Sequence, residues 1–402
     1  MTSKKKSRAR VISPQPFFSP RGTPFSVYYR TLVTSQLGVD IDLLTYGEGQ
    51  DAELPGVRIV RIPRFRFLGP VKIGPSFLKL FLDGFLFLWT VALMIRNRYD
   101  FVHAHEEAIF FCRLLKPIFG FKLVYDMHSS LPQQLTNFQF TRSKTLIRIF
   151  KNLEESSLRA SDAIITICPE LADYVDRQIE PNGRHVLIEN SIFEPVKLKT
   201  RASCASRADC GADVETVTLI RSGGPLVVYA GTLEPYQGID LLIGSWRHVI
   251  RKRPDALLLI VGGTPDQVAA YRAQTKSAGV ADAVQLTGRV PQHVARQWIE
   301  KAAVLVSPRI HGTNTPLKIY EQIASGIPLV ATAIYSHTQV LNDEVAFLVE
   351  PEPDHVAQGI LKALESKEDR KRVVANALKL YQAKYSRPVY ETKLKTVIER
   401  VR

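Results

Sequence analysis

Short apolar runs alternate with helical stretches along most of this chain, and this alternation limits the folds that it can adopt. The apolar runs are rich in valine, isoleucine and leucine without a polar face, which is typical of strands buried on both sides. The stretches between them are long enough for the crossover helices that parallel strands require. The pattern therefore predicts an α/β protein built from parallel sheets.

The alternation occurs twice, with a break between the two series. Strands are expected at 11–13, 40–45, 58–62, 101–104, 122–125, 163–167 and 185–189, and then at 226–231, 257–261, 284–287, 303–306 and 327–331. Helices are expected at 24–37, 77–96, 143–159, 240–251, 265–278, 292–301, 354–365, 368–384 and 389–402. From residue 200 to 224 the periodicity stops and Arg, Ser, Ala, Asp and Gly accumulate, which is typical of a linker. We therefore expect domains at 1–199 and 225–385, with a last segment at 386–402.

The chain is basic, with a net charge of +14 over 402 residues. Such an excess favours nucleic acid, anionic lipid or phosphorylated substrates as partners. Neither a zinc-finger spacing nor an aromatic RNA-binding strand is present, so nucleic acid is not expected. In Arg64–Leu68, charged and large apolar residues alternate, which favours an anionic membrane surface. A solvated basic loop is the alternative.

The segment Phe77–Ile95 is apolar enough to suggest a membrane span. It contains Lys79, Asp83 and Gly84, and the two charges are costly inside a bilayer. A buried helix packed on a sheet is the better interpretation, and a helix that touches a membrane is the alternative. The N-terminus lacks the apolar core of a signal peptide, which predicts a cytoplasmic protein.

The four cysteines do not have a metal-binding spacing. Cys112 and Cys168 lie in apolar runs and are expected to be small core residues. Cys204 and Cys210 lie in the predicted linker, where they could pair, although the reduced state is the default for a cytosolic protein.

The segment Ser307–Thr332 combines a strand end, a polar turn, a helix and a second strand. The turn Gly312–Thr315 precedes Pro316, which suits the first turn of a helix. Free amide groups at such a helix start can bind an anion. Lys318 and Glu321 are three residues apart, so both can lie on the helix face beside that anion. An ordinary connecting loop is the alternative.

This segment resembles the donor-site motif of family 4 retaining glycosyltransferases, which have the GT-B fold. Glu321 matches a family glutamate that binds the ribose hydroxyls of the nucleotide, whereas Thr313 stands where the family usually has another glutamate. The resemblance implies two Rossmann-like parallel-sheet domains that face a cleft. It also implies that the C-terminal helix crosses back to the first domain.

A second turn, 230–238, departs from the family pattern. Thr232 and Gln237 occupy the positions where many members have an arginine and a lysine that hold the donor diphosphate. Arg309 and Lys318 are the nearest replacement cations, so we expect these two to stabilise the leaving group. The predicted donor-binding residues are Glu321, Gly312, Thr313, Asn314, Thr315, Pro316, Leu317, Val290, Gly231, Thr232 and Gln237.

In the first domain, His128 follows a strand and matches a family histidine that lines the reaction centre. Gly22 and Thr23 precede a helix and suit a phosphate on the acceptor side. His105 is a second candidate for the acceptor side. It follows the preceding strand with His103, Glu106 and Glu107, and these four are expected to be rim residues or, alternatively, a metal site. A purely structural role is the alternative for His128.

The resemblance implies an enzyme that moves a sugar from a nucleotide diphosphate sugar to a lipid-linked or polysaccharide-precursor acceptor, with retention at the anomeric carbon. It implies neither a cofactor nor a metal, since no Asp-x-Asp motif is present and Lys and Arg can replace a cation. A sugar-nucleotide 2-epimerase and a non-catalytic nucleotide-sugar-binding scaffold are the alternatives. A peripheral position at the inner membrane face is expected from the basic segment.

Overall fold

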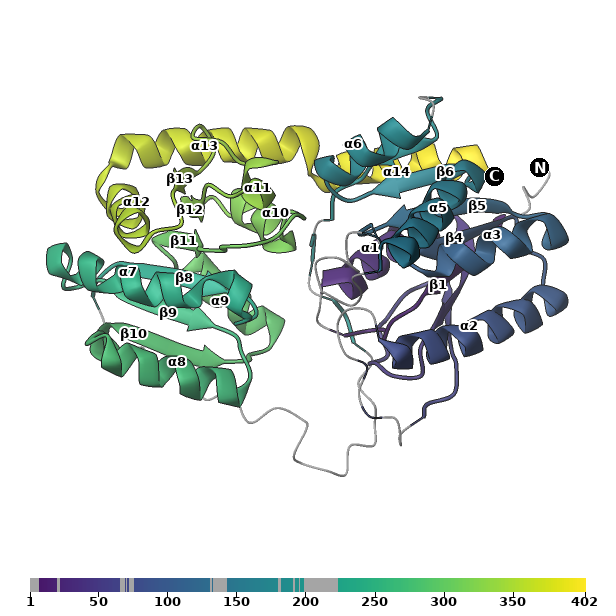
Figure 1. The fold of residues 1–402 in the computed structure, drawn as a ribbon. Coiled ribbons are helices and arrows are strands. Elements are labelled where there is room, and N and C mark those ends of the chain that lie inside the picture. The colour runs from purple at the N-terminus through teal and green to yellow at the C-terminus, as the bar shows by residue number, and fades with distance from the viewer. Residues whose placement is uncertain are drawn as a thin grey trace. The chain divides into compact units, whose positions relative to one another are not determined.

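Two parallel sheets organise the chain (Figure 1). The computed structural model describes residues 7–19, 22–65, 69, 71, 76–130, 132, 143–179, 182–190, 192–194, 196–198 and 223–402. The chain divides into a first unit, Met1–Thr200 with Arg387–Arg402, and a second unit, Arg201–Ser386. Most of the predicted linker, 200–222, lies outside the described residues, as do Cys204, Cys210 and residues 66–68 of the predicted basic segment Arg64–Leu68.

The first unit contains a seven-stranded parallel sheet in the order β3-β2-β1-β4-β5-β6-β7. Its strands are β1 (Ser7–Ser13), β2 (Val39–Thr45), β3 (Val57–Arg61), β4 (Phe101–His105), β5 (Lys122–Met127), β6 (Ala163–Thr166) and β7 (His185–Leu187). The strand order reverses between β1 and β4, so the carboxyl ends of these strands meet at the topological switch point where open α/β sheets bind ligands.

Helices cover both faces of this sheet. The helices α1 (Gly22–Gln36) and α14 (Arg387–Val401) pack on one face, and α2 (Phe77–Arg96), α3 (Ala108–Phe119), α5 (Lys144–Ala160) and α6 (Pro169–Gln178) pack on the other. The C-terminal helix α14 is anchored by Tyr390, whose ring centroid lies 5.1 Å from that of Phe193. Lys393 adds an ion pair with Glu189 at 2.7 Å. The last helix of the chain therefore belongs to the first unit.

The second unit has a six-stranded parallel sheet in the order β10-β9-β8-β11-β12-β13. Its strands are β8 (Leu226–Ala230), β9 (Leu257–Val261), β10 (Val284–Gly288), β11 (Val304–Ser307), β12 (Leu329–Thr332) and β13 (Phe347–Val349). One face is covered by α7 (Ile239–Lys252), α8 (Pro265–Ser277) and α12 (Pro353–Glu365). The other face is covered by α9 (Gln292–Glu300), α10 (Leu317–Ala324) and α13 (Lys367–Lys384). The switch point here lies between β8 and β11.

The predicted fold class is confirmed, because both sheets are parallel and covered by helices on both faces. The largest difference in a predicted boundary is at β1, which begins at Ser7 instead of Val11. Arg8 and Arg10 hid this start, since charged residues are unusual in a central strand. Both form ion pairs with Asp42 of the neighbouring strand, at 3.1 and 3.5 Å. Cys112 and Cys168 are buried, as predicted.

The prediction that α2 is a buried helix is wrong for half of its surface. Leu82, Leu86, Thr90 and Met94 are buried against the sheet, but the opposite face of the helix is exposed. The sequence did not distinguish the two faces because both are apolar, so the usual polar stripe of a surface helix is missing.

Candidate functional site

The site in the second unit is built from two turns that touch each other. The first turn follows β8 and contains the short helix η2 (Pro235–Gln237), which ends at Gly238. A side chain at Gly238 would be strained, because φ is +72° and a Cβ would lie 1.9 Å from the carbonyl oxygen of Pro308. The amide of Ile310 donates to the carbonyl of Tyr236 at 3.0 Å. The turn after β8 is therefore held directly against the segment that follows β11.

Lys318, on the first turn of α10, lies where these two turns meet. Its ammonium donates to Oε1 of Gln237 at 3.3 Å and lies 4.2 Å from the ring centroid of Tyr229. Burial, together with the nearby Arg309 guanidinium, lowers the pKa of Lys318 to about 7. The structure thus brings the predicted cation to the turn in which Gln237 replaces the usual lysine.

Arg309 lies on the other side of the same site. Its guanidinium is 5.2 Å from the ring centroid of Tyr236, and its Nε donates to the carbonyl of His311 at 2.5 Å. Burial lowers its pKa from the usual arginine value. Gly312 adopts φ +138°, and a Cβ there would lie 2.0 Å from Nη2 of Arg309. A glycine is therefore required where the chain passes over this guanidinium.

Glu321 lies one helical turn beyond Lys318 and is half-buried. Burial raises the pKa of Glu321 to about 7, and Arg296 of α9, 3.9 Å away, opposes this increase. Because the ion pair between Arg296 and Glu321 is long, it compensates little of the charge on the Glu321 carboxylate. The helix α10 thus presents a cation and a carboxyl group that are both costly to bury in the free protein.

The remaining predicted donor residues surround this pair. Thr232 accepts from the Gln237 side-chain amide at 3.5 Å, and a Cβ at Gly231 would lie 3.6 Å from the Lys318 ammonium nitrogen. Thr313 is fixed through its carbonyl by Gln339. Asn314 and Thr315 lie in the turn before α10, and Leu317 is the first residue of that helix. Val290 follows β10 and packs beside the core under α9.

The predicted position of Pro316 is corrected by one residue. Pro316 is the N-cap, with φ −65° and ψ 137°, and α10 starts at Leu317. Its extended ψ keeps it outside the helix, although its φ suits either position. The Pro316 carbonyl accepts the first bond, from the amide of Ile319 at 3.0 Å.

His337 is a residue of this site that the sequence did not reveal. It is completely buried and connects two strand ends, since Nε2 lies 3.0 Å from Oγ of Ser307 and Nδ1 lies 2.8 Å from the carbonyl of Thr332. Burial lowers its pKa to about 4, so it is neutral at physiological pH. The hydroxyl of Thr332 in turn donates to the carbonyl of Arg309. His337 therefore positions the backbone from which Arg309 projects.

A buried ionic cluster lies between α1 and the carboxyl-terminal halves of β4 and β5 in the first unit. Arg30 and Asp126 are fully buried and form an ion pair at 2.9 Å, and the second carboxylate oxygen lies 3.2 Å from Nε2 of His128. His103 lies 3.0 Å from the carboxylate, and its ring stacks on that of His105 at 4.6 Å. Arg30 was recognisable in the sequence only as the single charged residue of the helix 22–36.

The prediction that His103 and His105 are rim residues is wrong, because both are buried. The strand β5 continues to Met127, two residues beyond the predicted end, which places Asp126 inside the sheet. Its carboxylate lies within 3.6 Å of Nδ1 of His105, so both histidines face the interior. His128 is also buried, and its imidazole contacts Asp126. Gly22 and Thr23, the other residues predicted on the acceptor side, begin α1.

The donor atoms of His103, His105 and Asp126 lie within 4.8 Å of one another, which is close enough for a metal ion. However, Arg30 donates to the same carboxylate. The Arg30 guanidinium both supplies the positive charge that Asp126 needs and would repel a metal ion. The cluster is therefore better described as an ion-pair network.

We expect Asp126→Asn to lower the free energy of unfolding of the first unit by about 3–5 kcal/mol, because Arg30 would remain buried without its counter-charge. Urea denaturation followed by circular dichroism measures this loss. Asp173→Asn is the control, since Asp173 is exposed on α6. Equal stability of the two variants would contradict a structural role for the pair.

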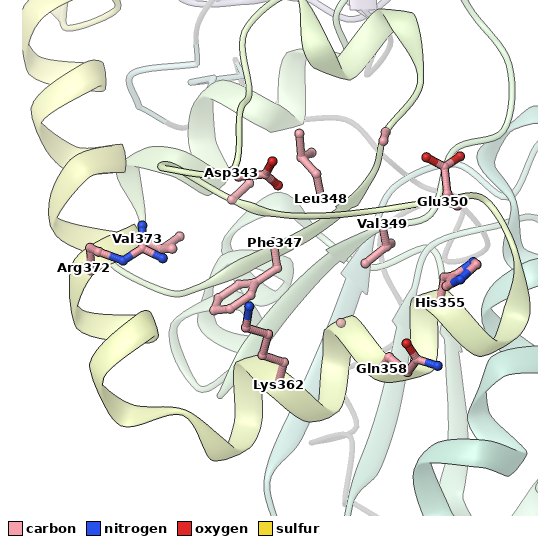
Figure 2. A pocket seen from close by; sticks show the side chains of 13 residues that line it. Asp343, Phe347, Leu348, Val349, Glu350, His355, Gln358, Lys362, Arg372 and Val373 are labelled. Atoms are coloured by element: carbon pink, nitrogen blue, oxygen red, sulfur yellow. The ribbon is translucent and has the colours of Figure 1, made fainter.

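A pocket of about 540 Å³ lies elsewhere in the second unit, between α12, α13 and the edge strand β13 (Figure 2). Lys362, Arg372 and His355 line it together with Asp343 and Glu350. Arg372 is paired with Asp369 at 3.0 Å, and Lys362 lies 3.9 Å from the same carboxylate. The lining residues include none of the predicted donor residues. The pocket is therefore separate from the candidate site.

Family models match a segment of each unit of the chain. Residues 214–380 match the family model described as "Glycosyl transferases group 1", and residues 30–191 match the "Glycosyl transferase 4-like domain". The putative glycosyltransferase YtcC of Bacillus subtilis is 28% identical over 44% of this chain and 45% of its own length. The D-inositol 3-phosphate glycosyltransferase of Xylanimonas cellulosilytica is 27% identical over 56% of this chain and 54% of its own length. The chain thus spans about half the length of these curated relatives.

Solved structures extend the likeness of fold to the whole chain. The sucrose-phosphate synthase of Thermosynechococcus elongatus superimposes with a TM-score of 0.73 at 19% identity, over 98% of this chain and 99% of that one. Anabaena HepE, solved in complex with UDP-glucose, gives a TM-score of 0.67 at 14% identity, over 98% and 99% of the two chains. At these identities the comparison with solved structures shows the fold alone.

Proposed function

Because the chain belongs to the group 1 glycosyl transferases, we propose that it transfers a sugar from a nucleotide diphosphate sugar to a lipid-linked or polysaccharide-precursor acceptor, with retention at the anomeric carbon. One observation carries the proposal. Lys318 lies 3.3 Å from Gln237, so a cation on α10 reaches the turn in which the family's usual cations are missing. The enzyme class follows from the family, and the donor, the acceptor and the stereochemistry are the proposed part.

Lys318 and Arg309 would bind the diphosphate of the donor. Both are partly withdrawn from water, so their attraction to an anion is stronger than on an open surface. A bound diphosphate would raise the pKa of Lys318 again, because an opposite charge favours the ammonium form. Binding near neutral pH would therefore take up a proton at Lys318.

Glu321 would accept hydrogen bonds from the ribose hydroxyls, and the backbone at Val290 would contact the base. Amides of the turn Gly312–Leu317 would hold phosphate or sugar oxygens at the start of α10. The HepE structure with UDP-glucose supports a nucleotide sugar as the ligand of this fold.

In the proposed reaction, the bond between the anomeric carbon and the diphosphate oxygen breaks while the acceptor hydroxyl attacks from the same face. The proton of that hydroxyl passes to the departing phosphate oxygen, so no separate protein base is needed. Negative charge grows on the diphosphate as the bond breaks, and Lys318 and Arg309 are the groups that stabilise it. Their proposed contribution is therefore to the rate of transfer as well as to donor binding.

A thermal-shift screen with UDP, GDP and ADP sugars tests the donor. A sugar nucleotide that binds only the folded protein raises Tm, with about 2.7 kcal/mol of stabilisation at a hundred times Kd. We expect one base to give the largest shift. The absence of a shift with every donor, at concentrations where related enzymes are saturated, would contradict nucleotide-sugar binding.

Product analysis separates the proposed reaction from its alternatives. Protein incubated with the donor alone leaves the sugar configuration unchanged if it is a transferase, whereas an epimerase converts it. Nuclear magnetic resonance of a transferred product would show the anomeric configuration of the donor if the reaction is retaining. Binding without transfer to any acceptor would favour the scaffold, which the residues Thr232, Gln237 and Thr313 first suggested.

A further inference from the structure

The helix α2 presents an exposed face that is almost entirely apolar. Its outward positions are Phe77, Leu80, Phe81, Gly84, Leu88, Ala92 and Ile95, followed by Arg96 at the end. Phe77 is 81% exposed and Ile95 is 72% exposed, so the surface extends from one end of the helix to the other. A solvated surface helix normally has polar residues at such positions. The composition indicates that this face contacts something other than water.

The neighbouring helix α3 continues the surface. In Figure 1, α2 and α3 lie beside each other, and they are in contact. Leu114 and Ile118 of α3 are 59% and 72% exposed. We call these residues the apolar face: Phe77, Leu80, Phe81, Leu88, Ile95, Leu114 and Ile118. Single exposed leucines are common on proteins, but seven large exposed apolar side chains on two contacting helices are not.

The charges around the apolar face are mainly positive. The helices α2, α3 and α5 together contain eight lysines and arginines and three acids. The acids are occupied: Asp83 accepts from the Tyr46 hydroxyl at 2.6 Å, Glu154 accepts from Ser130, and Glu155 pairs with Lys151 and Arg159. Arg96 and Arg148 are exposed on α2 and α5. Lys116 is paired with Asp162, and Lys151 and Arg159 are paired with Glu155, so we take Arg96 and Arg148 as the exposed cations. An apolar surface with exposed cations on its own helix and on α5, which packs against α3, is complementary to anionic lipid headgroups above acyl chains.

Two other arrangements fit less well. Among the described residues, α2 is the helix that is long and apolar enough to cross a membrane. Crossing would pull Leu82 and Leu86 out of the core and separate Asp83 from Tyr46, so α2 is better suited to lie in the plane of the interface. A second copy of the chain would bring two basic surfaces together, and like charges oppose such an interface.

We propose that the apolar face of α2 and α3 binds the surface of a bilayer that contains anionic phospholipid, with the cations of α2 and α5 contacting the headgroups. This interaction is independent of the proposed donor and stands without it. It places the protein peripherally on a membrane and, if the acceptor is lipid-linked, brings the first unit to that acceptor.

Vesicle co-sedimentation tests this surface in the full-length protein. The probes are vesicles of phosphatidylcholine alone and of phosphatidylcholine mixed with phosphatidylglycerol. We expect sedimentation with the mixed vesicles, and binding that weakens as salt is added because the cations are exposed. In Leu80→Glu with Leu88→Glu, the bound fraction should fall at least about tenfold, since two carboxylates would enter the interface.

Ala375→Glu with Ala383→Glu is the matched control, because it adds the same charge to exposed positions of α13 in the second unit. If both double variants lost the same fraction of vesicle binding, the loss would be explained by net charge alone, and the proposed surface would be overturned. Absence of wild-type sedimentation with anionic vesicles would also overturn it. A dimer seen by analytical ultracentrifugation and removed by Leu80→Glu with Leu88→Glu would assign the surface to a second copy instead. A circular dichroism melt and the thermal shift with the donor verify that the variants are folded.

Discussion

Lys318→Met is expected to lower kcat for sugar transfer by about a hundred- to a thousandfold, the usual effect of removing one group that stabilises transition-state charge. The Lys318 ammonium lies 3.3 Å from Gln237, in the turn that also contains Thr232, and methionine fills a similar volume without charge. The kcat should fall more than KM rises, because the charge on the diphosphate is greatest while its bond to the sugar breaks. Steady-state kinetics with the donor found by the thermal-shift screen measure both constants.

The same substitution is expected to stabilise the protein when no donor is bound. Burial lowers the pKa of Lys318 from 10.5 in the unfolded chain to about 7 in the folded one. Between these values the unfolded chain binds more protons, so the free energy of unfolding rises with pH, and the penalty is complete below pH about 7. Lys318→Met removes that penalty and should raise Tm by about 2–4 °C for each kcal/mol recovered at pH about 6.

Lys362→Met is the control for both measurements, since Lys362 is an exposed lysine of the same unit. It should change neither kcat nor Tm. Loss of activity in Lys318→Met together with a lower Tm at pH about 6 would point to a damaged fold. Unchanged activity would transfer the catalytic role to Arg309 alone.

The glycine turn and the helix that follows it could be predicted from the sequence, because their backbone conformations depend on neighbouring residues. A glycine turn followed by a helix predicts free amides at the helix start, and Gly312 does adopt a φ of +138°. From the sequence, Lys318 could be predicted only as a nearby cation that replaces those missing from the turn 230–238. Its hydrogen bond to Gln237 could not be predicted. The distance of this bond depends on Gly238 packing against Pro308, a contact between segments far apart in sequence.

The buried polar groups were the part that sequence patterns missed. His337, Arg30 and Asp126 are fully buried, and each has a hydrogen-bond or ion-pair partner on another element of the same unit. A pattern of apolar and polar residues does not show such partners, and it treats a buried charge as a surface residue. The same limitation affected α2, where an apolar residue exposed to solvent looks identical to one in the core.

Glu321→Gln is expected to raise KM for the donor, with a smaller effect on kcat, so that kcat/KM falls about a hundredfold. The ribose would contact Glu321 both in the ground state and in the transition state. Loss of the Glu321 carboxylate should therefore affect donor binding more than the chemical step. A hydrogen bond to a charged acceptor contributes about 1.5–3 kcal/mol, and two hydroxyls share this carboxylate in the proposed complex. Glu368→Gln, on the exposed surface of α13, is the matched control.

The stability of Glu321→Gln should depend on pH in the opposite sense to that of Lys318→Met. The folded protein raises the pKa of Glu321 from 4.5 to about 7, so between these values the folded state binds more protons. The free energy of unfolding therefore falls as pH rises through this range, and the penalty is complete above pH about 7. Glu321→Gln should raise Tm at pH about 8 and change it little at pH about 4. Opposite pH dependences in the two variants, each with loss of activity, would show that α10 carries two charges that cost stability until a donor is bound. If Glu321→Gln left the donor KM unchanged, Glu321 would not be the ribose ligand.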